Sequence, residues 1–204
     1  MTTQLTLIDA GTGNLRSVLK AFESLGANVV LTSKPSIVRK ADKLVLPGVG
    51  SFGDFMKGLR HLDLDDVLIE KSKSGTLLLG ICVGMQALFE KGLEMGEYHG
   101  LGLLKGEVER FPESINLKIP HTGWNQLWPA VPSPLLENIN PGAYAYFNHS
   151  YYCSAYNPDP VILFTDYGFR FPSAVQRDNL FGVQFHPEKS QRVGLQVLAN
   201  FLQL

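Results

Sequence analysis

Residues 76–89 read TLLLGICVGMQALF, and this stretch decides the fold class. The apolar run from Leu77 to Ile81 predicts a short buried strand. Met85, Leu88 and Phe89 then recur at helical spacing, so we expect a helix to follow directly. A strand that passes straight into a helix is the building unit of α/β proteins.

Between the strand and the helix lies a nucleophile-elbow pattern with Cys82 at its centre. The turn crowds the backbone two residues before and after, and Gly80 and Gly84 provide the space. The following helix would favour a thiolate at Cys82, and the Val83 N–H would face an oxyanion. Two interpretations stay open on this motif alone: a reactive thiol, or a buried cysteine in a strand–turn–helix unit.

The chain before the elbow alternates strands with helices. Strands are predicted at residues 4–9, 29–31 and 44–46, with an amphipathic helix at 15–25 and further helices over 55–62 and 63–73. This order predicts parallel βαβ units, and hence a three-layer α/β fold whose open, mostly parallel sheet carries helices on both faces.

After the elbow the pattern changes. Residues 103–111 and 143–154 resemble strands with no good helix between them, and residues 129–141 hold four prolines, which predict irregular structure. A strand at 181–185 precedes a closing helix, for which Ser190 is a plausible N-cap. We therefore expect extra antiparallel strands in the second half, within a single domain over residues 1–204.

Composition excludes several classes of protein. The chain has 204 residues, 45% hydrophobic and 18% charged, with a net charge of −1, which argues against disorder and against nucleic acid as the main partner. Neither a signal peptide nor an apolar run long enough for a membrane is evident. The two cysteines make no disulfide framework, so we expect a reduced, cytoplasmic protein. Residues 11–16, GTGNLR, lack the third glycine of a dinucleotide-binding fingerprint.

A nucleophilic cysteine needs a base, and His186 with Glu188 is the best candidate pair. In extended chain the two side chains project to the same side, so the carboxylate can orient the imidazole. His149 is the rival base but has no nearby carboxylate. Cys153 is the rival nucleophile, although no glycine flanks it. His61 and His99 lie among polar residues and are expected at the surface.

A second loop accompanies the elbow. Residues 47–52, PGVGSF, directly follow a predicted strand, so they would lie at the same sheet edge as the elbow, where ligands of open α/β sheets bind. Their backbone N–H groups could approach a ligand closely. The alternative is an ordinary turn.

Together these segments resemble the class I (triad) glutamine amidotransferases. The resemblance is carried by GICVGMQ at the elbow, PGVGSF, and GVQFHPEKS over residues 182–190. Within that family the chain is similar to the glutaminase subunits of imidazole glycerol phosphate synthases, from end to end. The discriminating segments are residues 13–18, 119–125, 146–152 and 174–191. Ala10, Thr122 and Asn148 depart from the family pattern.

The resemblance implies a glutaminase with named residues in each role. Its catalytic residues are Cys82, His186 and Glu188, and its oxyanion hole is formed by Val83, Val49 and Gly50. The residues implied for glutamine binding are Gly48, Gly50, Gln86, His149, Ser150 and Tyr151. Neither a metal nor another cofactor is implied.

The resemblance also implies a partner. Ammonia would pass to a (β/α)₈ cyclase, which makes imidazole glycerol phosphate and an aminoimidazole carboxamide ribonucleotide for histidine biosynthesis. The chain is too short to hold that barrel, so a heterodimer is expected. The implied interface residues are Asn14, His121, Trp124 and Asn125; Trp124 could instead be a core residue. The alternatives are a glutaminase serving another synthase, such as pyridoxal phosphate synthase, and a non-catalytic regulatory partner.

Overall fold

The structure is a computed structural model that describes residues 3–155 and 160–204. The first half alternates strands and helices, as expected. Its elements are β1 (Gln4–Ile8), α1 (Leu15–Ser24), β2 (Asn28–Thr32), α2 (Pro35–Val38), β3 (Lys43–Gly48), α3 (Phe52–His61), α4 (Leu64–Lys73), β4 (Leu77–Cys82) and α5 (Val83–Gln86).

The second half is mostly strands. Its elements are β5 (Phe89–Gly92), β6 (Tyr98–His99), β7 (Leu104–Arg110), β8 (His121–Pro129), β9 (Ala143–His149), β10 (Tyr151–Ala155), β11 (Val161–Asp166), β12 (Arg170–Arg177), β13 (Leu180–Val183) and α6 (Gln191–Gln203). Short 3₁₀ turns cover Glu113–Ile115, Pro134–Leu136 and Pro187–Lys189.

The main sheet has the strand order β2-β1-β3-β4-β13-β12-β11-β8-β9. The five strands from β2 to β13 pair in parallel, and β12, β11, β8 and β9 continue the sheet antiparallel. The prediction of an α/β sheet whose parallel strands are extended by antiparallel ones is confirmed, and with four parallel and four antiparallel pairings the sheet is mixed. Because β13 pairs with β4, with Gly182 opposite Gly80, the segment after β13 reaches the sheet edge at which β4 ends.

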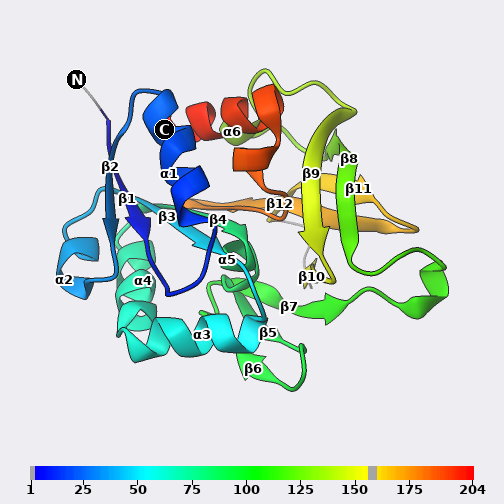
Figure 1. The fold of residues 1–204 in the computed structure, drawn as a ribbon, viewed down its shortest axis with the longest axis horizontal. Coiled ribbons are helices and arrows are strands. Elements are labelled where there is room, and N and C mark those ends of the chain that lie inside the picture. The colour runs from blue at the N-terminus through cyan, green and yellow to red at the C-terminus, as the bar shows by residue number, and fades with distance from the viewer. Residues whose placement is uncertain (1–2, 156–159) are drawn as a thin grey trace.

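Helices cover both faces of the parallel part. In Figure 1, α1 and α6 lie on one side of the sheet and α3 and α4 on the other. Each helix buries an apolar stripe against the strands: Val18 and Phe22 of α1 and Leu198 and Phe201 of α6 are 1% exposed or less. The rigid three-layer core therefore holds the ends of β3, β4 and β13 in place.

A second sheet, with the order β10-β7-β5-β6, was not predicted. It explains why the elbow helix is shorter than the sequence indicated. The prediction that Leu88 and Phe89 continue the helix is wrong, because α5 ends at Gln86. The carbonyl of Leu88 instead accepts hydrogen bonds from the N–H groups of Leu103 and Leu104, and Phe89 opens β5. Pairing with a distant segment thus overrides the local helical spacing.

Two other expectations need correction. Residues 143–154 form two strands rather than one, since β9 ends at His149 and β10 begins at Tyr151. Ser190 stands at the N-cap of α6 by position, but its hydroxyl makes no capping bond. That hydroxyl donates to the His186 carbonyl and accepts from the Tyr146 N–H, so it ties β9 to the turn after β13.

Candidate active site

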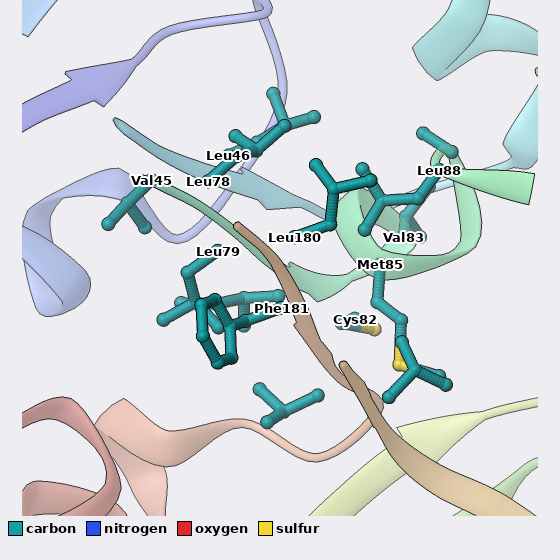
Figure 2. Packing of buried hydrophobic residues seen from close by; sticks show 14 of the residues in the cluster. Val45, Leu46, Leu78, Leu79, Cys82, Val83, Met85, Leu88, Leu180 and Phe181 are labelled. Atoms are coloured by element: carbon teal, nitrogen blue, oxygen red, sulfur yellow. The ribbon is translucent and has the colours of Figure 1, made fainter. Parts of the chain in front are cut away.

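Cys82 occupies the turn between β4 and α5. Its backbone has φ +55° and ψ −112°, a conformation that non-glycine residues adopt only when the surrounding structure enforces it. Figure 2 shows the cysteine at the start of the α5 turn, with Val83 and Met85 following it. Such strain is typical of a nucleophile elbow, where the turn projects the side chain beyond the sheet edge.

Both elbow glycines are required by backbone packing. A Cβ on Gly84 would overlap the carbonyl oxygen of Leu46 in β3, and a Cβ on Gly80 would lie against the carbonyl of Gly84. Gly48 is restricted in the same way, because its Cβ would approach the Gly84 nitrogen at 2.8 Å. The one-turn helix therefore packs directly on β3, which fixes where the Cys82 side chain emerges.

His186 lies with Cys82 and Glu188 in one cluster of side chains. Its Nδ1 lies 3.0 Å from Glu188 Oε1, and His186 and Cys82 line the same pocket. Burial alone would lower the pKa of His186, but the hydrogen bonds and negative charges of Cys82 and Glu188 outweigh it and raise the pKa to about 10. The geometry is that of a nucleophile, a base and an orienting carboxylate.

Asn14 is the further partner of Glu188. The Glu188 side chain is 1% exposed, and its Oε1 accepts a hydrogen bond of 3.3 Å from Asn14 Nδ2 in the loop before α1. Its Oε2 is buried without a hydrogen-bond partner within the described residues. Asn14, predicted at an interface, therefore also contacts the candidate triad.

A pocket of about 270 Å³ opens beside the sulfur of Cys82. Its volume suits a small molecule. The residues that line it are Val49, Gly50, Cys82, Val83, Gln86, Glu94, Pro120, Asn148, His149, Ser150, Tyr151, His186 and Lys189. This set includes every residue that the sequence analysis assigned to glutamine binding except Gly48, which lies buried in β3 beneath the pocket.

Glu94 and Gln184 lie at this site but were not predicted. Glu94 lines the pocket, and its Oε2 accepts a hydrogen bond of 2.6 Å from the Phe52 N–H at the start of α3. Gln184 is fully buried and its Nε2 lies 3.7 Å from Cys82 Sγ. Glu94 sits in a glycine-rich segment without periodicity, which offers no local signal. Gln184 interrupts the apolar run of the strand predicted at residues 181–185. A polar residue within a buried strand could have indicated that Gln184 belongs to the site.

Of the four residues predicted at an interface, the three on β8 divide by strand alternation. Trp124 pairs with Tyr146 across β8 and β9 and is 46% exposed, so the core alternative for Trp124 is wrong. His121 and Asn125 stand an odd number of residues away and point to the other face of the sheet. His121 is 3% exposed, and its ring is stacked on Phe147 and Tyr167. Such burial does not fit the expected contact between His121 and a partner.

The rival catalytic residues have unsuitable protonation properties. Burial, opposed by the hydrogen bond to the Tyr151 carbonyl, lowers the pKa of His149 to about 3, so its ring is a weak base. Burial raises the pKa of the Cys153 thiol well above its usual range, and that thiol is inaccessible. His61 and His99 are exposed, as predicted. Across residues 3–155 and 160–204, no cluster of three or more His, Cys, Asp or Glu side chains could hold a metal ion.

Comparisons with known proteins identify the family. Residues 6–204 match the model of the class-I glutamine amidotransferases. The chain is 49% identical to the imidazole glycerol phosphate synthase subunit HisH of Salinibacter ruber, over 98% of this chain and 94% of that protein. It is 50% identical to the HisH subunit of Aquifex aeolicus, over 96% of this chain and 94% of that protein.

Solved structures agree on the fold. A crystal structure described as a glutamine amidotransferase superposes with a TM-score of 0.76 at 19% identity, covering 98% of this chain and 99% of that chain. With residues 6–204 matched, and with the elbow, the base and the carboxylate brought together, the chain belongs to the class-I glutamine amidotransferases and, within them, to the family of imidazole glycerol phosphate synthase HisH subunits.

Proposed function

We propose that residues 1–204 act as one glutaminase domain, which hydrolyses L-glutamine to glutamate and ammonia at Cys82. The observation that carries the proposal is the Cys82–His186–Glu188 unit at the wall of a small pocket. The likeness to HisH subunits of imidazole glycerol phosphate synthases supports the same reaction class.

The reaction begins with attack of the Cys82 sulfur on the side-chain amide carbon of glutamine. The Val83 N–H stabilises the resulting oxyanion, because the first amides of a helix have no partner within the helix. The backbone N–H groups of Val49 and Gly50, which line the same pocket, complete the oxyanion hole. Gly50 has φ +95°, so the peptide beside it can rotate at low cost.

His186 moves the proton in both half-reactions. As imidazolium it protonates the leaving ammonia, and as neutral imidazole it then takes a proton from the water that attacks the glutamyl thioester. Glu188, held to Nδ1 at 3.0 Å, keeps the ring oriented and stabilises its positive charge. The raised pKa of His186 supports an imidazolium beside the sulfur before glutamine binds.

The two ends of glutamine find complementary groups in the pocket. The Glu94 carboxylate is suited to the α-ammonium group. The backbone of Ser150 and Tyr151 lines the same pocket and is suited to the α-carboxylate, while Gln86, whose amide protons are bonded within the protein, offers its side-chain oxygen to the amide end. Because the pocket is small, longer side-chain amides should be excluded.

The ammonia is passed to a (β/α)₈ cyclase subunit. An exposed aromatic face on β8 and β9 supports docking, because Trp124 is 46% exposed, Trp128 39% and Tyr144 53%. Three exposed aromatic side chains grouped on two paired strands are typical of an interaction surface, whereas a single exposed apolar residue is not. The cyclase then makes imidazole glycerol phosphate and an aminoimidazole carboxamide ribonucleotide. A reactive Cys82 thiol must stay reduced, which fits the cytoplasm. Among the described residues no helix is both long and apolar enough to cross a membrane.

Glutamate release from L-glutamine tests the proposal. The assay compares the wild type, Cys82→Ala and the matched control Cys153→Ala, each alone and with the cyclase subunit and its ribonucleotide ligand. Cys82→Ala should lose glutamine hydrolysis, while Cys153→Ala keeps it. The Cys82→Ala complex should still form the imidazole product when ammonium salts replace glutamine. Glutaminase activity retained by Cys82→Ala would disprove the assignment.

A further inference from the structure

Two histidines face each other on neighbouring strands, and one of them, His149, lines the pocket. His121 of β8 lies opposite His149 of β9, and His121 Nδ1 is 3.0 Å from His149 Nε2. Both residues are buried, at 3% and 6% exposure. The His121 ring is stacked on Tyr167, with ring centroids 4.0 Å apart, so its orientation is constrained.

The groups at both ends of this pair determine where the protons are. At one end the Tyr151 carbonyl accepts from His149 Nδ1 at 2.8 Å; because a carbonyl can only accept, Nδ1 carries the proton. At the other end the Gln126 N–H donates to Asn125 Oδ1 at 2.8 Å. That bond turns the Asn125 amide nitrogen toward His121 Nε2, 3.2 Å away, so Nε2 accepts.

The two assignments agree in the middle. A neutral His121 that accepts at Nε2 must carry its proton on Nδ1, and that proton points at the acceptor Nε2 of His149. Burial lowers the pKa of His121 to about 4 and that of His149 to about 3, so both rings are uncharged at neutral pH. Every donor in this series of hydrogen bonds, from Asn125 to the Tyr151 carbonyl, therefore meets an acceptor.

The series of hydrogen bonds continues from the Tyr151 carbonyl to the nucleophile. The Tyr151 carbonyl also accepts a hydrogen bond of 3.1 Å from Gln86 Nε2, and the second proton of that amide goes to Gln184 Oε1 at 3.0 Å. Gln184 Nε2 then lies 3.7 Å from Cys82 Sγ. An unbroken series of hydrogen bonds thus connects Asn125 on β8 to the sulfur.

We propose that His121 is a positioning residue for glutamine hydrolysis, which acts through His149, the Tyr151 carbonyl, Gln86 and Gln184 on the Cys82 sulfur. This inference rests on the proposed glutaminase function. His121 touches neither glutamine nor the reacting sulfur. It holds the Nδ1–H of His149 on the Tyr151 carbonyl, and that carbonyl in turn holds the Gln86 amide, whose orientation decides which end of the Gln184 amide faces the sulfur.

Alkylation of Cys82 by the diazoketone analogue of glutamine measures this effect. The probe forms a thioether with the thiol and releases N₂, and its binding constant and maximal rate are obtained separately. His121→Phe keeps an aromatic ring for stacking but lacks the donor, and should lower the maximal rate about tenfold, the effect of one lost buried hydrogen bond. His121→Asn places an amide N–H where Nδ1 was and should stay within about threefold of the wild type.

The two variants also separate positioning from packing. His121→Asn removes more apolar volume, so its thermal midpoint should be lower than that of His121→Phe although its alkylation is faster. Thr122→Val is the matched control, because it removes the adjacent cross-strand bond to Asn148 and leaves the series of hydrogen bonds from Asn125 to Cys82 intact. Alkylation rates that follow the thermal midpoints, or an unchanged rate in His121→Phe, would overturn the proposal.

A third readout observes the protons directly. Nitrogen-15 NMR of labelled histidine at neutral pH should show both rings uncharged with the proton on Nδ1. A proton on Nε2 of His149 would contradict the proposal even if the kinetics agreed. If the wild type hydrolyses no glutamine with or without the cyclase, the proposed function itself fails; if it does and His121→Phe matches Thr122→Val, only the positioning role fails.

Discussion

Lowering the pH from 6.5 to 5 should destabilise the fold through His121 and His149. Their pKa values in the folded protein are about 4 and about 3, against 6.5 for an unperturbed ring. Within this pH range the unfolded chain takes up a proton at each position and the folded chain does not. The stability that these two rings provide is therefore complete well above pH 6.5 and is lost as the pH falls through 6.5 toward 4 and 3.

The size of the effect follows from the linkage relation. Between pH 6.5 and 5 each ring costs about 1.6 kcal/mol of unfolding free energy, so the pair costs about 3 kcal/mol. His186 acts in the opposite direction, because its pKa is raised to about 10. Its stabilisation is complete below pH 6.5 and is lost as the pH rises toward 10, so in this range it offsets only about 0.4 kcal/mol. The net loss is large beside a typical stability of about 5–15 kcal/mol.

Urea unfolding followed by circular dichroism at pH 6.5, 6.0, 5.5 and 5.0 measures the loss. The wild type and the control Thr122→Val should show the full dependence, and His121→Phe about half of it, whatever its absolute stability. A stability that is flat between pH 6.5 and 5, or a His121→Phe variant with the full wild-type dependence, would refute the burial of two uncharged rings.

Three further substitutions test other parts of the structure. Gly84→Ala should prevent normal folding, because its Cβ would overlap the Leu46 carbonyl; an unchanged thermal midpoint would contradict the elbow packing. Lys43→Met should cost about 1–2 kcal/mol in urea unfolding, because the buried Lys43 ammonium donates to the carbonyls of the last turn of α6; equal stability would show that those bonds contribute nothing. Trp124→Ala should weaken cyclase binding by about 2 kcal/mol, roughly thirtyfold in Kd, with little effect on folding; titration calorimetry showing unchanged affinity would remove Trp124 from the interface.

The parallel half of the fold was predictable because its signals are local. Short apolar runs mark β1, β3 and β4, and helical stripes such as Val18 and Phe22 lie between them. The helices predicted at residues 15–25, 55–62 and 63–73 differ from α1, α3 and α4 by only a few residues at their ends. Each element buries the face that its own periodicity defines, so no distant partner is needed to recognise it.

The second sheet could not be predicted, since its strands are defined by distant pairing. β5 pairs in parallel with β7 although both are partly polar, and Leu88 bonds to residues 103 and 104 instead of continuing a helix. Periodicity in a short window carries no information on such contacts. The same limit hid Glu94, whose position depends on how this sheet brings its loop to the start of α3.

The candidate site was found from the sequence where spacing encodes geometry. The elbow glycines and the His186–Pro187–Glu188 turn are local motifs, and the structure brings their side chains together with Cys82. Which face of β8 points outward depended on the register of the strand, which the sequence left open. Trp124 and Asn125 are neighbours in the strand and therefore point to opposite faces of the sheet, so a register shifted by one residue would exchange the exposed and the inward-facing side chain.

The central claim is that glutamine is cleaved through a covalent intermediate on Cys82. The most direct measurement is acid quenching of the complex during turnover of isotope-labelled L-glutamine, followed by peptide mass spectrometry. The account predicts a glutamyl thioester on the peptide that holds Cys82, no label on the peptide that holds Cys153, and no labelled cysteine in Cys82→Ala. Label on Cys153, or turnover with no labelled cysteine under any quench time, would contradict it.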